Sequence, residues 1–359
     1  MEKQGSGRVD FLDFMRVFAF SSVVIAHIFQ QALHTASADL SLHITVRLMA
    51  GLLHDVCYAG AAGVAVFFIT SGYIITHVLQ KELPLEFGIK RVFRIYPLYM
   101  LAVISEIAVA HFSGGQIPPL SVIIPRLLLI GDIFDTPYAL GGVEWTLRVE
   151  IMFYVFMGIL RFTGILSLTR VLPLLYLIIA LVLYYLPPFP HFAGWTDGYL
   201  GIYGPYLFIG SIIYLYEKKL SGLTISLLSV ACMMALFFIY TAEIKPGLKE
   251  TNHGIVTLLI FLTAWKFRDH FVAGTWVKTL SEMTYAIYLF HLWLWVHLDS
   301  LVTDYGLPFV NVSLQVIVIL LVICFILCRT VEKYGVGLGK RVVAQLTNKK
   351  HGAQVTAPA

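Results

Sequence analysis

The sequence predicts an all-α polytopic membrane protein with about ten transmembrane helices and both termini in the cytoplasm. Of its 359 residues, 58% are hydrophobic and only 13% are charged, whereas about 25% of the residues of a soluble domain are charged. Apolar stretches of membrane-spanning length recur along the chain, and basic residues gather on alternate connections between them. A chain of this composition belongs among integral membrane proteins, in which length does not indicate the number of domains.

Ten apolar stretches are candidates for crossing the membrane, since a transmembrane helix needs about 20 apolar residues. We expect spans near 11–33, 60–79, 93–112, 144–162, 167–186, 199–216, 222–241, 253–266, 280–298 and 309–328. A further stretch, 120–131, is too short and contains Pro125 and Arg126. It is therefore expected to be a re-entrant or interfacial segment.

The distribution of lysines and arginines predicts the orientation of the chain in the membrane. With the N-terminus inside, nineteen of the 25 fall on inner segments and four on outer segments, while Arg16 and Arg148 lie within spans. Cytoplasmic loops carry such an excess of cations. This predicts a plasma (inner) membrane protein whose N- and C-termini are both cytoplasmic.

The predicted domain organisation is simple. Residues 8–335 form one membrane-embedded domain, and 336–359 form a short disordered cytoplasmic tail that is basic at first and then small and polar. The first apolar stretch contains Arg16 and lacks a small-residue cleavage site, so we expect a retained span rather than a signal peptide.

Several classes of site are not expected. The four cysteines are scattered and form neither a disulfide framework nor a zinc pattern. The outer-segment histidines His34, His43 and His54 lack the spacing of a compact site, so no metal is expected. No run of basic and aromatic residues suits nucleic acid, which is excluded as a partner.

Arg16 and His27 in the first span are the most informative pair. Charged groups in hydrocarbon cost about 2.5–3.5 kcal/mol at a span centre, so they are seldom present without a use. Eleven helical residues return to within about 20° of the starting direction, so both side chains face one way, about 16 Å apart along the axis. Two readings stay open at this point: a lined catalytic cavity, or a snorkelling arginine with a packing histidine.

The fourth span carries a second group of candidates. Glu144, Trp145, Arg148 and Glu150 enter the apolar zone from the outer side. Glu150 lies about 9 Å in, and His27 about 6 Å from the outer face, so the two could meet at similar depth. A carboxylate beside an imidazole orients it and raises its basicity. The alternative is a structural pair of Arg148 with Glu150, although i,i+2 spacing does not place them on one face.

The remaining motifs admit both structural and functional readings. Ser71 and Gly72 form a small mid-span pair, for which close helix packing is favoured over chemistry. Arg91 and Arg94, with Lys90, open the third span and suit phosphate binding, although on these residues alone ordinary cytoplasmic flanking is the favoured reading. Pro97 is expected in the first turns of that span. His291 in the ninth span is, taken alone, typical of helix packing.

Together these pieces resemble the acyltransferase-3 family of integral membrane acyltransferases. The matching pieces are LDFMR followed by His27, VFFITSGYII, KRVFRIYP, EWTLRVEIMFY, TYAIYLFH and RTVEKYG, in the family's order. The resemblance implies transfer of an acyl group, often acetyl, from cytoplasmic acyl-CoA to a hydroxyl of a glycan or another acceptor. It also implies the stand-alone form, without a fused esterase-like domain.

The resemblance assigns roles residue by residue. Arg16 and His27 match the family's catalytic element and Glu150 its fourth-span glutamate, while Arg91 and Arg94, with Lys90, match its acyl-CoA-binding arginine motif. Supporting roles are expected for Asp13, Ser71, Trp145, Arg148 and His291. No cofactor is expected to be bound, because acyl-CoA, first of all acetyl-CoA, is the donor substrate. The expected partners are acyl-CoA, a glycan acceptor, the lipid bilayer and the machinery that assembles polysaccharide.

A mechanism follows from these roles. His27 acts as general base on the acceptor hydroxyl, and Arg16 stabilises charge nearer the cytoplasm. A covalent acyl-His27 intermediate is an open variant. The outer segments 34–59, 113–143 and 187–198 are the expected acceptor surfaces, and exopolysaccharide or its precursor is the first candidate acceptor. Two alternatives stay open: a succinyl donor that uses Arg148 or Arg126 as an extra cation, and a glycan or metabolite transporter.

Overall fold

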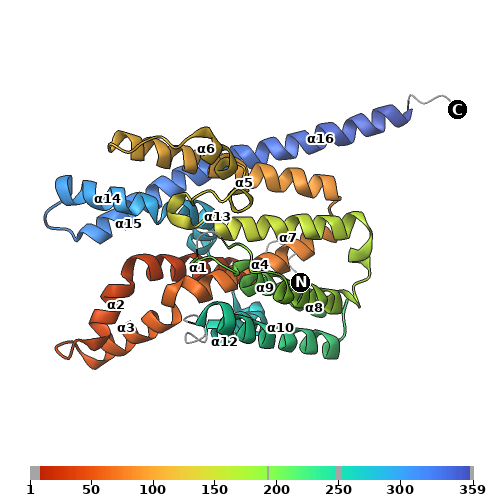
Figure 1. Cartoon of the computed structure of the whole chain (residues 1–359), viewed down its shortest axis with the longest axis horizontal. Helices are drawn as coiled ribbons and strands as arrows, with labels where there is room; N and C mark the ends of the chain where they lie inside the picture. The colour runs from red at the N-terminus through yellow and green to blue at the C-terminus, as the bar shows by residue number, and fades with distance from the viewer. Residues whose placement is uncertain (1–8, 192–193, 247–252, 356–359) are drawn as a thin grey trace. The chain divides into compact units, whose positions relative to one another are not determined.

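The computed structural model describes residues 9–191, 194–246 and 253–355, and this part of the chain is all-α, with helices joined by turns and 3-10 segments (Figure 1). The chain divides into two compact units. Unit 1 comprises Met1–Thr76 and Leu168–Thr284, and unit 2 comprises His77–Ser167 and Tyr285–Ala359. Each unit is described by itself below.

The described helices confirm a polytopic membrane protein. Six stretches are long and apolar enough to cross a bilayer: Asp10–Ala38, Ile44–Leu79, Pro84–Phe112, Tyr199–Glu217, Leu223–Ile244 and Val312–Thr347. A bent pair, Thr275–Phe290 with Trp293–Tyr305, raises the number to seven if it counts as one span. All ten predicted stretches are largely helical. The count of ten spans and the cytoplasmic termini stay predictions.

Unit 1 is a helical bundle formed by two chain segments that are separate in the sequence. Its helices are α1 (Asp10–Val24), α2 (Gln30–Ala38), α3 (Ile44–Val56), α4 (Ala61–Leu79), α8 (Leu172–Tyr185), α9 (Tyr199–Glu217), α10 (Leu223–Ile244), α12 (His253–Lys266) and most of α13 (Thr275–Phe290). A π-helical turn, Ile25–Phe29, joins α1 to α2. α8 and α12 have 14 residues each, which makes them short for a span.

Helices α4 and α9 of unit 1 touch backbone to backbone. A Cβ added at Gly72 would lie 1.9 Å from the Leu207 carbonyl oxygen, and one added at Gly210 would lie 2.0 Å from that of Ile69. Ser211 Oγ donates across the contact to the Gly72 carbonyl at 3.3 Å. Small residues allow such close approach between apolar helices, where dispersion and hydrogen bonds replace the hydrophobic effect. The packing interpretation of Gly72 is therefore confirmed.

Unit 2 contains the remaining helices. They are α5 (Pro84–Phe112), α6 (Leu120–Leu127), α7 (Trp145–Phe162), α14 (Trp293–Tyr305), α15 (Val312–Leu327), a π-turn (Cys328–Glu332) and α16 (Lys333–Val355), together with the end of α13. In α7, Arg148, Glu150 and Arg161 interrupt the apolar sequence.

The prediction for Pro97 was wrong, because α5 begins nine residues earlier than expected and places this proline in its interior. An interior proline cannot donate to the carbonyl four residues back, which here is that of Phe93. Gly335 of α16 lies against this carbonyl, since a Cβ added at Gly335 would come 2.6 Å from it. Gly339, one turn further, lies against the Phe93 side chain in the same way. The two glycines thus allow α16 to pack closely on α5 at Phe93, whose carbonyl Pro97 leaves without a helical donor.

Two further sequence predictions need correction. The segment from 336, predicted to be a disordered tail, continues α16 to Val355, because its first turns pack on α5. The stretch 280–298 is not one straight helix but bends by 84° between α13 and α14. The outer segment 34–59, for which no conformation was predicted, is mostly helical, in α2 and α3.

We predict that Gly72→Ala destabilises unit 1. The added methyl group would overlap the Leu207 backbone, so α4 and α9 must separate, and overpacking of this kind costs about 1–3 kcal/mol or more. Gly158→Ala on α7 is the matched control, because its Cβ would meet nothing within 4 Å. Thermal unfolding of the detergent-purified variants measures the effect. A midpoint for Gly72→Ala equal to that of the control would contradict the contact.

Candidate active site

His27 lies in the π-helical turn of unit 1. The turn spans Ile25–Phe29 and interrupts an otherwise continuous helix from Asp10 to Ala38. Gly60 and Gly63 press against α1 beside it, since a Cβ at Gly63 would lie 2.6 Å from the Ala19 carbonyl oxygen. The His27 side chain is exposed. Single π-turns within α-helices occur frequently at functional sites because they re-aim the side chains that they carry.

The π-turn changes the direction assumed for His27 in the sequence analysis. The estimate of a common face with Arg16 used regular α-helical steps throughout, whereas the backbone widens from Ile25 onward. A wider turn rotates each following residue by less than the α-helical 100°. The same-face geometry therefore holds for the eight residues up to Val24 and is altered by the π-turn for His27 itself.

Arg16 is held by a buried carboxylate. Its guanidinium lies 3.6 Å from Asp13 Oδ1, one helical turn earlier, and Asp13 is buried while Arg16 is half-buried. Ser281 Oγ on α13 donates to the same Asp13 oxygen at 2.6 Å. Asp10 fixes the neighbouring loop by accepting from the Ala273 amide at 2.9 Å. Asp13 thus holds Arg16 from one helical turn earlier, and its supporting role stays a prediction.

The two candidates lie toward opposite ends of unit 1. Helices α1 and α4 run antiparallel, because Phe11 packs on Tyr73 with ring centroids 5.9 Å apart, while Gly60 lies against Val23 and Ala26. Arg16 lies toward the end of α1 that contains Phe11. His27 lies just beyond the opposite end, where Gly60 contacts Val23 and Ala26. The two residues are therefore separated along the helix axis, within the unit that contains both.

Glu150 lies in unit 2, in contact with Tyr154. Tyr154 Oη donates to Glu150 Oε1 at 2.6 Å, and Glu150 is 5% exposed. Arg91 lies over the Tyr154 ring at 5.7 Å and over the Phe87 ring at 5.1 Å. Unit 2 therefore brings the predicted fourth-span glutamate and a predicted donor-binding arginine together through one tyrosine. The i,i+4 spacing of Glu150 and Tyr154 carried this signal, which the sequence analysis did not use.

Lys90 and Arg94 are placed differently from each other. Lys90 Nζ is bound by Glu82 at 2.7 Å and by Glu86 at 2.6 Å. Its charge is therefore balanced within unit 2. Arg94 is exposed at the next turn of α5. Of the predicted phosphate-binding set, the two arginines are the better placed, because an exposed or ring-stacked guanidinium keeps donors available.

Arg148 is at the centre of a buried charge network. Its guanidinium is ion-paired with Asp132 and lies 3.9 Å from Glu144, and it stacks on the Tyr138 ring at 4.7 Å. Gly131 leaves room for it, since a Cβ there would come 2.7 Å from the Arg148 side chain. The network ties the 131–144 connection to α7. Arg148 therefore pairs with Asp132 and Glu144, and no contact with Glu150 is present among its described ion pairs.

Trp145 and His291 have structural surroundings in unit 2. Trp145 is 8% exposed at the start of α7, and its neighbour Thr146 donates to Tyr288 Oη at 2.7 Å. His291 is fully buried at the bend between α13 and α14, where its Nδ1 lies 2.9 Å from the Tyr288 carbonyl oxygen. The Thr146–Tyr288 hydrogen bond joins the start of α7 to the end of α13. Supporting roles for Trp145 and His291 stay predictions.

The outer histidines have individual contacts. His43 caps α3 by accepting from the Thr45 amide at 3.3 Å, and the His34 and His54 rings lie 5.4 Å apart. His54 also contacts Asp55 at 2.9 Å. Over the described residues, no group of three or more potential metal ligands converges.

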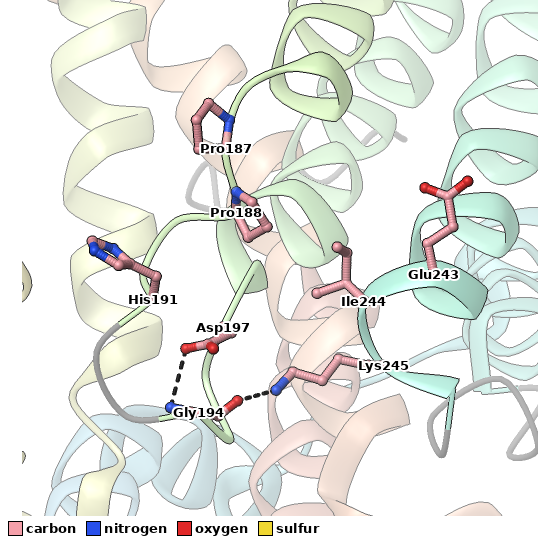
Figure 2. A pocket seen from close by; sticks show the side chains of 8 residues that line it. All are labelled: Pro187, Pro188, His191, Gly194, Asp197, Glu243, Ile244 and Lys245. Carbon is pink, nitrogen blue, oxygen red and sulfur yellow. Dashed lines mark hydrogen bonds between the residues drawn. The ribbon is translucent and has the colours of Figure 1, made fainter.

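A polar cavity opens beyond the start of α9 in unit 1 (Figure 2). It encloses about 520 Å³, and its lining residues are Pro187, Pro188, His191, Gly194, Asp197, Glu243, Ile244 and Lys245. Asp197 accepts from the Gly194 amide at 3.1 Å, and Lys245 donates to the Gly194 carbonyl oxygen, as the dashed lines in Figure 2 show. The α9 start lies at the His27 end of the unit, because the α9 terminus at Glu217 bonds Tyr73 at the other end. Five of the eight lining residues belong to the predicted outer segment 187–198, and the other three lie at the end of α10.

The fold and these paired charges define an integral membrane protein with functional groups buried among apolar helices. The family described as an acyltransferase domain, the acyltransferase-3 family, matches residues 9–329. The chain therefore belongs to this family.

Two curated relatives are similar to parts of the chain. Nodulation protein 10 of Rhizobium leguminosarum bv. viciae is 27% identical over 173 residues, which is 43% of this chain and 44% of the relative. Exopolysaccharide production protein ExoZ of Rhizobium meliloti (strain 1021) is 35% identical over 113 residues, 28% of this chain and 34% of the relative. The chain thus matches less than half the length of either protein. No solved structure matches.

We predict that Tyr154→Phe lowers acyl transfer at least about tenfold, because a hydrogen bond to a charged group contributes about 1.5–3 kcal/mol. The variant removes the donor to Glu150 and keeps the ring beneath Arg91. Tyr305→Phe is the matched control, since Tyr305 is 86% exposed. The measurement is the rate of acyl transfer by the purified wild type and the two variants. Wild-type activity in Tyr154→Phe would refute a functional link between Tyr154 and Glu150.

Proposed function

We propose that this protein is a membrane O-acyltransferase that moves an acyl group, most readily acetyl, from cytoplasmic acyl-CoA to a hydroxyl of a cell-surface polysaccharide or its precursor. The observation that carries the proposal is the placement of His27 in a π-turn of the first helix, beyond an Arg16 that Asp13 fixes, in a chain of the acyltransferase family. This provides a titratable group toward one end of unit 1 and a fixed cation toward the other.

The chemical step needs a base, a site for developing negative charge and a leaving thiolate. His27 accepts the proton of the acceptor hydroxyl as its oxygen attacks the thioester carbonyl. The tetrahedral intermediate then collapses, the carbon–sulfur bond breaks, and the proton passes to the coenzyme A thiolate. Arg16 stabilises negative charge on the donor side, where its guanidinium is already oriented and little reorganisation is needed.

The donor is assigned to the cytoplasmic side of the predicted ten-span topology. Arg91 and Arg94 are proposed to hold the coenzyme A phosphates, since guanidinium forks bind phosphate through paired donors. Lys90 contributes positive potential there, although Glu82 and Glu86 bind it directly. Glu150 is proposed as a further catalytic group, with Tyr154 fixing its carboxylate.

The acceptor is assigned to the outer side. The cavity beyond α9 carries imidazole, carboxylate and ammonium groups on an open wall, which suits the hydroxyls of a sugar. Trp195 beside it is 49% exposed and offers a flat apolar face for a sugar ring. The name of the matching exopolysaccharide production protein supports a glycan acceptor of this class.

Acetyl is favoured over succinyl by the state of the two candidate cations. A second carboxylate on the acyl group would need its own positive partner. Arg148 is paired with Asp132, and Arg126 Nε donates to the Pro137 carbonyl oxygen at 2.7 Å. Both are therefore already used to hold the connection before α7.

We predict that His27→Ala lowers acetyl transfer by at least about 100-fold, because a general base contributes about 10²–10⁴ to the rate. His111→Ala is the matched control, as His111 is an exposed histidine near the end of α5. The measurement is transfer of labelled acetyl from acetyl-CoA by the full-length variants in vesicles, at equal protein levels. Near-wild-type transfer by His27→Ala would overturn the mechanism.

A further inference from the structure

A second, more apolar cavity lies at the opposite end of unit 1, between α9, α10 and α12. It encloses about 840 Å³, within the range of sites for lipid- or drug-sized molecules. Aliphatic side chains line it together with Tyr216, Ser226, Trp265 and a group of charged residues, which we call the mouth. The aliphatic residues are Ile212, Ile213, Leu223, Leu227, Val230, Leu258 and Leu262.

Cations outnumber anions at the mouth of this cavity. Lys219, Lys266 and Arg268 face Glu217 and Asp269 there. The Glu217 carboxylate accepts from Trp265 Nε1 at 2.6 Å and is ion-paired with Lys218 at 2.8 Å. By contrast, neither Lys219 nor Lys266 has an ion-pair partner among the residues that the structure describes. The mouth therefore has positive charge available to an added anion.

Backbone geometry strengthens the case for an anion at this position. Lys219 has φ +56°, just after the end of α9, where glycine is the usual residue. Its amide bonds the Tyr216 carbonyl oxygen at 3.0 Å, which fixes the turn that carries the lysine. Helix α10 begins directly afterwards at Leu223, and no side chain caps its N-terminus. An uncapped helix N-terminus offers amide donors to a phosphate.

The aliphatic wall continues onto a surface suited to hydrocarbon. Leu223 is 51% exposed and Leu227 is 60% exposed, both on α10, which is itself a candidate membrane span. A molecule in the cavity can thus keep its apolar tail against these leucines while its head lies at the cations. Basic pockets between transmembrane helices bind the headgroups of anionic lipids in this way.

We propose that this cavity is a binding site for an anionic glycerophospholipid of the surrounding bilayer. The phosphate lies between Lys219, Lys266 and the start of α10, and one acyl chain lies along Leu223 and Leu227. The site is separate from Arg16 and His27, and it does not depend on the proposed chemistry. It stabilises the end of unit 1 at which Glu217 joins α4, α9 and α12 through Tyr73 and Trp265.

Native mass spectrometry of the full-length protein in detergent tests the proposal. Phosphatidylglycerol and phosphatidylcholine with identical chains are the probes, each added at equal concentration. The wild type is expected to retain phosphatidylglycerol at least about tenfold more readily, and Lys219→Gln/Lys266→Gln is expected to lose this preference. Lys340→Gln/Arg341→Gln, on the exposed side of α16, removes the same charge and should leave the preference unchanged.

A second variant tests the apolar wall. Val230→Phe fills the cavity without changing charge and should reduce phosphatidylglycerol retention severalfold. Equal retention of both lipids by the wild type, or an unchanged preference in both cavity variants, would overturn the proposal. Displacement of phosphatidylglycerol by a polyprenyl phosphate or by acetyl-CoA at lower concentration would also overturn it, because the site would then belong to an acceptor carrier or to the donor.

Discussion

The structure of this protein depends on the pairing of charges inside apolar helices. A bare charge at the centre of a span costs about 2.5–3.5 kcal/mol on insertion scales, and a neutralising partner removes much of that cost. Arg16 is held by Asp13, Arg148 by Asp132 and Glu144. Each pair also joins its helix to another segment of the same unit, through Ser281 in the first case and the 131–144 connection in the second. The pairs thus act as the polar connections of a bundle that the hydrophobic effect alone would not order.

The charged residues differ in whether they are bound within the protein or exposed on its surface. The contacts of Arg148, Arg126 and Lys90 are made within the protein, so these cations serve mainly as structural ties. Arg94 is exposed on α5, and His27 is exposed in a π-turn. Exposed side chains of this kind can be reached by a substrate, and both residues belong to the proposed site.

The helices were predictable from the sequence, but their irregularities were not. Hydropathy marks apolar helices of spanning length because the bilayer leaves no other way to satisfy the backbone. It does not detect the π-turn at His27, the interior position of Pro97 or the bend beside His291, because these depend on glycine contacts and packing from distant segments. The partners of the charged residues were missed for the same reason. Asp132 and Ser281 reach theirs only when the chain is folded, whereas the i,i+4 pair of Glu150 with Tyr154 was visible in the sequence.

One measurement directly tests the proposed transfer of an acetyl group to a surface glycan with His27 as the general base. Mass spectrometry of the surface polysaccharide compares cells that carry the wild-type gene, no copy, or a His27→Ala copy. We expect the mass of one acetyl group per modified sugar to be lost in both defective strains, with polysaccharide yield unchanged. An unaltered modification pattern in the His27→Ala strain, or a lower yield with the modification intact, would contradict the account.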